Sequence, residues 1–161
     1  MKKYLPFTIF FISLNLFSAE KQTAPSHLQV GLGVFDIGHE HPHPQFMVEY
    51  RRNINYHNIR PLISISGTDK GSIYLCGGAG LDIFMGKYFV LTPSFAPGLY
   101  IRGNGKELGL PLEFRSSIEL AFILPNKGRL GAQYYHISNA SLGYKNPGEE
   151  SLIFFYAIPL N

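Results

Sequence analysis

Apolar and polar side chains alternate along most of the chain from residue 28 onward, in segments separated by Gly, Asn and Pro. Successive side chains of a β-strand point to opposite faces, so a period of two is typical of strands with one apolar face. The pattern predicts eight strands and no helix between them, over residues 28–34, 46–50, 59–66, 73–83, 89–99, 112–122, 130–138 and 150–158. We therefore expect one all-β domain over residues 26–161.

Two folds share this alternation. In a soluble sandwich the apolar face is the core, whereas in a membrane barrel it meets lipid and the polar positions fill the lumen. The polar positions here carry both signs of charge in similar number: Glu49, Arg51, Arg60, Asp82, Glu113, Arg115, Glu119 and Arg129. Such charges can pair inside a narrow lumen that side chains fill. We therefore predict an eight-stranded antiparallel transmembrane β-barrel.

Prolines are the local exception to this pattern. Pro61, Pro93, Pro97 and Pro111 fall in or beside predicted strands, and each removes a backbone donor. The prediction places bulges or strand ends at these positions.

The first residues have the composition of an export signal. Lys2 and Lys3 give a basic start, residues 4–17 are almost wholly apolar, and Ser18 and Ala19 are small. The apolar run is shorter than the ~20 residues of a membrane-spanning helix. We expect residues 1–19 to be a signal peptide, with cleavage near residues 18–24.

Composition supports an exported barrel. Only 16% of the 161 residues are charged, against about 25% in ordinary soluble domains. Removing Lys2 and Lys3 from the 14 Lys and Arg, against 11 Asp and Glu, lowers the formal net charge from +3 to about +1. The basic balance therefore belongs partly to the signal, and nucleic acid is not an expected partner. The single Cys76 excludes an internal disulfide.

Candidate chemistry lies between residues 128 and 160. His136 and Ser138 are two apart on a predicted strand, so they share a face with α-carbons roughly 7 Å apart. Glu150 opens the next strand and would return beside them in a hairpin. A serine, a base and an acid that orients the base are the parts of a hydrolytic triad. Glu149 has the opposite parity, and we interpret it as a solvated loop charge.

This stretch resembles the active-site signature of the PagL lipid A 3-O-deacylases. The resemblance is carried by His136-Ile137-Ser138-Asn139-Ala140, Asn146-Pro147-Gly148 and Glu150. It implies an eight-stranded outer-membrane barrel that hydrolyses the ester at the 3-position of lipid A and releases a 3-hydroxy fatty acid. By position, the resemblance implies Ser138 as nucleophile, His136 as base and Glu150 as orienting acid.

The resemblance also suggests Asn139 and Asn146 as oxyanion support, with backbone N–H groups of residues 140–143 as further candidates. No metal or organic cofactor is required by this chemistry. The implied partners are lipid A or lipopolysaccharide and other lipids of a Gram-negative outer membrane. Because an even number of strands leaves both termini in the periplasm, the longer loops and the site would face the outer leaflet.

Several alternatives stay open. Residues 39–43 read His-Glu-His-Pro-His and have metal-ligand chemistry, although an exposed polar loop fits the interrupting proline better. Four cations on predicted outer loops could pair with lipid A phosphates or simply be solvated: Lys70, Arg102, Lys106 and Lys145. A non-catalytic barrel acting as an envelope tether or adhesin is the alternative function, and a secreted soluble esterase is a third. A homodimer is possible.

Overall fold

The computed structural model describes residues 24–38, 42–54 and 56–160. The expected signal peptide lies outside these residues and stays a prediction. The strands are β1 (Ser26–Phe35), β2 (His43–Arg51), β3 (Ile59–Thr68), β4 (Ile73–Leu81), β5 (Ile83–Met85), β6 (Phe89–Ile101), β7 (Leu112–Ile123), β8 (Arg129–Ser138) and β9 (Glu149–Leu160).

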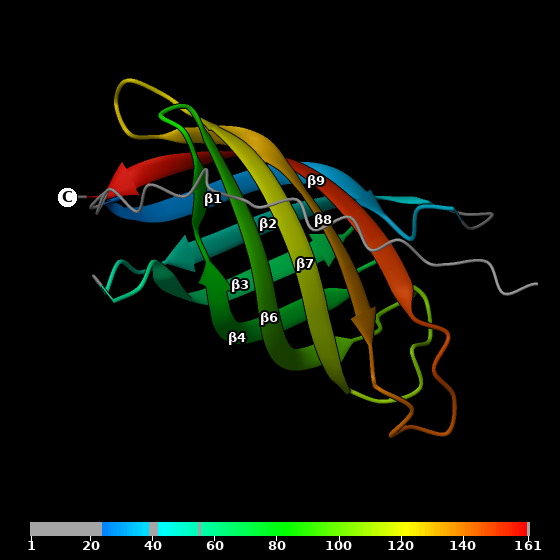
Figure 1. Cartoon of the computed structure of the whole chain (residues 1–161). Coiled ribbons are helices and arrows are strands. Elements are labelled where there is room, and N and C mark those ends of the chain that lie inside the picture. Colours follow the sequence, from blue (N-terminus) through cyan, green and yellow to red (C-terminus); the bar gives the residue numbers. More distant parts are fainter. Residues whose placement is uncertain (1–23, 39–41, 55, 161) are drawn as a thin grey trace, which may run out of the picture.

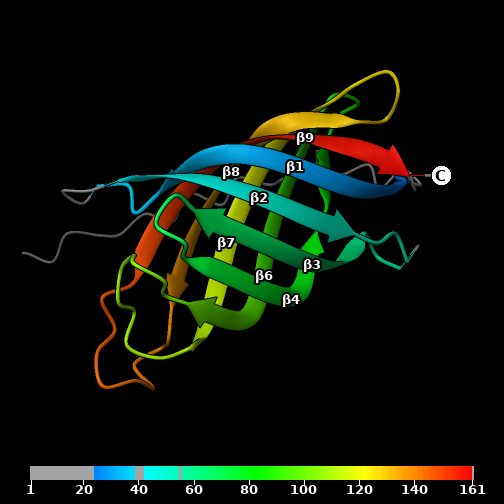
Figure 2. The same ribbon diagram turned by 180° about the vertical axis from the view of Figure 1, so that it is seen from behind.

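These strands close into a single antiparallel barrel (Figures 1 and 2). Each strand pairs with its neighbour in sequence, β9 returns to pair with β1, and β4 closes the circle against β6. β4 and β5 follow one another along the same side of β6, separated only by Asp82, and both pair with β6 in the same register. Together they count as one strand of the wall, so the barrel is eight-stranded and the predicted fold is confirmed.

The prolines are accommodated differently from the prediction. Pro61 lies inside β3, and Pro93 and Pro97 lie inside β6, rather than at bulges or strand ends. The β6–β7 register runs through both prolines without a bulge. On the other side of β6, pairing with β4 and β5 is interrupted opposite these prolines. Only Pro111 precedes its strand as expected.

Charged side chains fill the lumen. Arg51 Nε lies 2.5 Å from Glu49 Oε1, and its Nη2 lies 2.6 Å from Glu119 Oε2. Arg115 Nη2 lies 2.5 Å from the second oxygen of Glu49. All four side chains are buried. Because each charge meets an opposite charge within hydrogen-bonding distance, the lumen offsets part of the cost of removing these groups from water.

A second lumenal cluster lies around Asp82. Its carboxylate accepts hydrogen bonds from Arg129 at 2.5 and 3.1 Å, and Arg60 Nε lies 3.5 Å away. Glu113 is the exception to the predicted pairing, because its buried carboxyl oxygens meet no hydrogen-bond donor among the described side chains. The mixed charges of the sequence are otherwise paired in the lumen.

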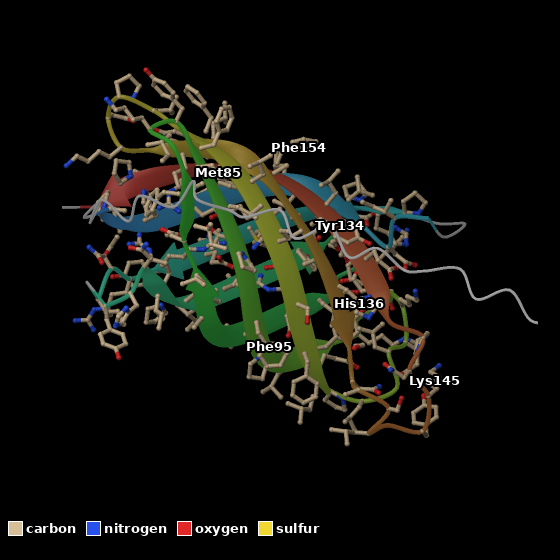
Figure 3. The ribbon with its side chains drawn as sticks, in the orientation of Figure 1. Met85, Phe95, Tyr134, His136, Lys145 and Phe154 are labelled. Atoms are coloured by element: carbon tan, nitrogen blue, oxygen red, sulfur yellow. The ribbon has the colours of Figure 1, made fainter. Side chains whose placement is uncertain are left out.

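The outer wall is apolar. Exposed large apolar side chains project from every strand of the barrel wall, and Phe95, Tyr134 and Phe154 extend away from the barrel in Figure 3. Within the described ranges, no helix is long and apolar enough to cross a membrane. The end of β1, the start of β2 and the loops at residues 69–72, 102–111 and 139–148 share one end of the barrel, which we call the loop end. β1 begins and β9 ends at the opposite end (Figure 1).

Candidate active site

His136 and Glu150 are direct partners across the β8–β9 ladder. His136 Nδ1 lies 3.0 Å from Glu150 Oε1, a hydrogen-bonding distance. Their side chains are 43% and 32% exposed, while their neighbours Ile137 and Glu149 are buried. The imidazole and its carboxylate therefore lie on the outer wall, and Nδ1 is engaged while Nε2 stays available.

Ser138 is the last residue of β8 and lies on the same outward face as His136. Among the described residues, no hydrogen bond joins the Ser138 hydroxyl to the imidazole. Hydrogen bonds between catalytic groups are often long without substrate and tighten when it binds. The strand thus places the serine two residues beyond the histidine on the same outward face.

A tight turn follows the serine at once. The N–H of Leu142 donates to the carbonyl of Asn139 at 3.0 Å, and the two central residues, Ala140 and Ser141, have φ values of 53° and 62°. Positive φ at both central positions is typical of a type I′ turn. Such values are uncommon without glycine and cluster at functional sites. The turn ends β8 directly after Ser138, at the loop end of the wall.

Asn139 ties two loops together. Its side chain is fully buried, and Nδ2 donates to the carbonyls of Leu108 and Lys145, both at 2.8 Å. Its backbone N–H donates to Asn146 Oδ1 at 3.0 Å. Both side-chain donors of Asn139 are thus in use, so its contacts favour a positioning role. Asn146 is exposed and keeps its own amide N–H groups free to donate.

Gly148 is a residue whose role the sequence reasoning missed. Its φ is +64°, and a Cβ added there would lie 2.7 Å from Cε1 and 3.3 Å from Nε2 of His136. The backbone of Gly148 therefore lies against the imidazole. The signal was a glycine two residues before the acid. Sequence reasoning also missed two outer-wall neighbours on β7, Phe114 opposite Ser138 and Ser116 opposite His136.

The interpretation of Glu149 as a solvated loop charge is wrong. Its parity does put it off the outer face, but the side chain is fully buried on the lumenal side. There its Oε2 accepts hydrogen bonds from Ser151 Oγ at 2.9 Å and from the N–H of Asp36 at 3.3 Å. Glu149 is therefore separated from His136 by the barrel wall.

The possible metal ligands are largely beyond the described part of the chain. His39, Glu40 and His41 fall in the gap, and His43 Nδ1 pairs with Asp69 Oδ1 at 3.3 Å. No group of three or more His, Cys, Asp or Glu residues that could hold a metal ion occurs within the ranges that the structure covers.

Comparisons with known proteins identify similar barrels. The family model described as "PagL: Lipid A 3-O-deacylase (PagL)" matches residues 83–159. The crystal structure of the outer membrane enzyme PagL superposes with a TM-score of 0.64 at 19% identity, covering 83% of this chain and 99% of that one. The Yersinia pestis outer membrane protein Ail, in a phospholipid bilayer nanodisc, gives 0.50 at 14% identity with the same coverage.

No curated protein sequence matches the chain. At these identities the two superpositions show the barrel fold alone. The matched segment contains β8, β9 and the loop between them, and so includes all the candidate site residues. Residues 83–159 are therefore similar to the family of PagL lipid A 3-O-deacylases.

Proposed function

We propose that this lipid A 3-O-deacylase cleaves its ester through a serine triad. Ser138 is the nucleophile, His136 the general base, and Glu150 the acid that orients the imidazole. The observation that carries the proposal is the 3.0 Å contact between His136 Nδ1 and Glu150 Oε1 on the outer wall, with Ser138 on the same face. Since Glu150 accepts from Nδ1, the neutral imidazole presents Nε2 as the base.

The reaction is an acyl transfer in two steps. His136 Nε2 takes the proton of Ser138 as its Oγ attacks the carbonyl of the 3-linked acyl chain, and Glu150 stabilises the imidazolium. As the bond from the carbonyl carbon to the 3-oxygen breaks, the imidazolium protonates this oxygen, so the glucosamine leaves with a free 3-hydroxyl and an acyl-serine remains. Water, deprotonated by His136, hydrolyses this ester and releases the 3-hydroxy fatty acid. The steps use side chains and water alone.

The oxyanion of the tetrahedral intermediate needs hydrogen-bond donors. Asn146 is our candidate, because its Oδ1 is fixed by the Asn139 N–H while its Nδ2 stays free. The backbone N–H groups of Ala140 and Ser141 are further candidates, since neither donates within the described residues. One such donor is typically worth about 3–4 kcal/mol in the transition state. Asn139 contributes by holding Asn146 and the turn in place.

The position of the proposed triad on the outer wall supports a lipid substrate. A polar triad facing hydrocarbon is costly unless it serves the lipid it meets. β1 begins and β9 ends at the end opposite the loops, so the loop end faces outward if the termini are periplasmic. The site then lies in the outer leaflet, where lipid A resides, and the acyl ester approaches from the side of the barrel.

The test is Ser138→Ala in Gram-negative cells without another lipid A deacylase. We expect cells with the native protein to lose one 3-hydroxyacyl chain from lipid A, measured by mass spectrometry, and cells with the variant to keep it. Heat-modifiable migration on gels checks that both barrels fold. If both strains lose the chain, the triad is refuted although the activity stands. If neither loses it, the tether or adhesin, which the family match does not favour, becomes the better reading.

A further inference from the structure

Four basic residues occupy loops at the loop end, and the structure separates them by their partners. Lys106 Nζ lies 2.6 Å from Asp36 Oδ1. Arg102 Nη1 lies 2.8 Å from Glu107 Oε2. The charges of these two cations are therefore already balanced, and they are poor candidates for binding an anionic ligand.

Lys145 differs from both. Its Nζ lies 5.4 Å from the centroid of the Tyr144 ring, and no carboxylate in the described ranges forms an ion pair with it. Tyr144 is 77% exposed, so the ring and the ammonium are presented outward together. The N–H of Gly109 and, to a smaller extent, Lys145 lower the pKa of the Glu107 carboxyl, but this carboxylate accepts its side-chain hydrogen bond from Arg102. Lys145 thus offers a positive charge that no carboxylate of the described residues pairs with.

The backbone of Lys145 is fixed next to the proposed nucleophile. Its carbonyl accepts from Asn139 Nδ2 at 2.8 Å, and Asn139 directly follows Ser138. Gly109 packs so closely that a Cβ there would lie 2.8 Å from Lys145 Cγ. Figure 3 shows Lys145 and His136 at the same end of the barrel. The backbone and the Cγ of Lys145 are therefore held by contacts within two packed loops, at the end of the barrel that carries His136.

We propose that Lys145 binds the phosphate on the glucosamine that carries the 3-linked ester, and so selects phosphorylated lipid A. The inference rests on the proposed function. The phosphate on carbon 1 and the ester on carbon 3 share one sugar ring, so a substrate with its ester at Ser138 brings this phosphate to the loop beside the serine. A lysine ammonium is a compact charge suited to phosphate, and Tyr144 offers a face for the sugar.

The experiment compares two substrates in detergent micelles, lipid A with both phosphates and lipid A lacking the 1-phosphate. We measure kcat/KM for the native protein, Lys145→Ala and Lys145→Arg, with Lys70→Ala as control. Lys70 is an exposed lysine on the β3–β4 loop of the same end, so its removal changes the net charge equally. We expect Lys145→Ala to lose about tenfold on the bisphosphorylated substrate, and little on the 1-dephosphorylated one.

Lys145→Arg should keep most of the activity, and Lys70→Ala should match the native protein on both substrates. Equal losses on both substrates would mean that Lys145 only holds the loop, and equal effects of Lys70→Ala and Lys145→Ala would mean a general charge effect. Either result overturns the inference while the deacylase activity stands. A native protein inactive on both lipids would instead refute the proposed function.

Discussion

Glu149 and Glu150 are adjacent, chemically identical and placed on opposite sides of one wall. Glu149 points into the lumen, where Ser151 and the N–H of Asp36 satisfy one oxygen. Glu150 points outward and accepts from His136. The lumenal face of β8 and β9 is thus built for packing, while the outer face at the loop end leaves polar atoms available to lipid. Strand parity alone separates a structural carboxylate from a proposed catalytic one.

Neutralising each glutamate in turn tests whether the two carboxylates have different roles. We expect Glu150→Gln to lower kcat about 10³-fold, because an amide cannot hold the imidazole tautomer or stabilise its positive form. Glu149→Gln should change kcat by less than about twofold, since it keeps an acceptor and lies across the wall. Initial rates on lipid A in micelles measure both. Equal losses in the two variants would show that the faces are not independent.

The second effect separates the two asparagines of the turn. We expect Asn146→Ala to lower kcat about 10²-fold through loss of an oxyanion donor. Asn139→Ala removes the hydrogen bonds to the carbonyls of Leu108 and Lys145, so we expect this variant to loosen the two loops in addition to lowering kcat. Limited proteolysis of folded protein measures loop opening beside kcat. Rapid cleavage of Asn146→Ala at these loops would instead assign Asn146 a purely structural role.

The third effect concerns the close approach at Gly148. Gly148→Ala places a Cβ 2.7 Å from His136 Cε1, and the imidazole must move to accept it. Small displacements of a catalytic group are costly, so we expect kcat to fall about 10- to 100-fold. Gly71→Ala is the matched control, because its φ is +76° and a Cβ there meets nothing within 4 Å. Both variants carry the same kind of backbone strain, but only Gly148→Ala contacts the base.

The fold was predictable because the alternation of apolar and polar side chains can be read within each strand separately. Every strand assigns its apolar positions to the outer wall and its polar positions to the lumen. Phe154 and Glu49, for example, lie on the faces that their parity assigns. The same parity predicted that His136, Ser138 and Glu150 share one face of the wall, and the family resemblance suggested their roles. The site residues themselves stay predictions until the variants are measured.

What could not be predicted depends on contacts between distant segments. The approach of Gly148 to His136 is set by the path of residues 139–148, where Ala140 and Ser141 take positive φ without a glycine to signal it. The burial of Glu149 depends on the end of β1, which supplies the Asp36 N–H. The roles of the basic loop residues depend on which carboxylates reach them. Periodicity carries none of this information.

The smallest effect on activity should come from the lumen, even directly behind the site. Arg115 is the cross-strand partner of Ile137, the residue between His136 and Ser138. Its Nη2 lies 2.5 Å from Glu49 Oε2. Arg115→Met removes one partner of a buried pair, so we expect the unfolding free energy to fall by about 3 kcal/mol. Glu49 retains Arg51, and the backbone register of β8 is unchanged.

Urea titration in micelles measures the loss of stability, and kcat measured well below the new unfolding midpoint should stay within about twofold of native. A large loss of kcat in a fully folded Arg115→Met barrel would mean that the lumenal charges set the geometry of the outer face. The wall would then transmit strain from its charged interior to the imidazole, and the two faces would form one functional unit rather than two.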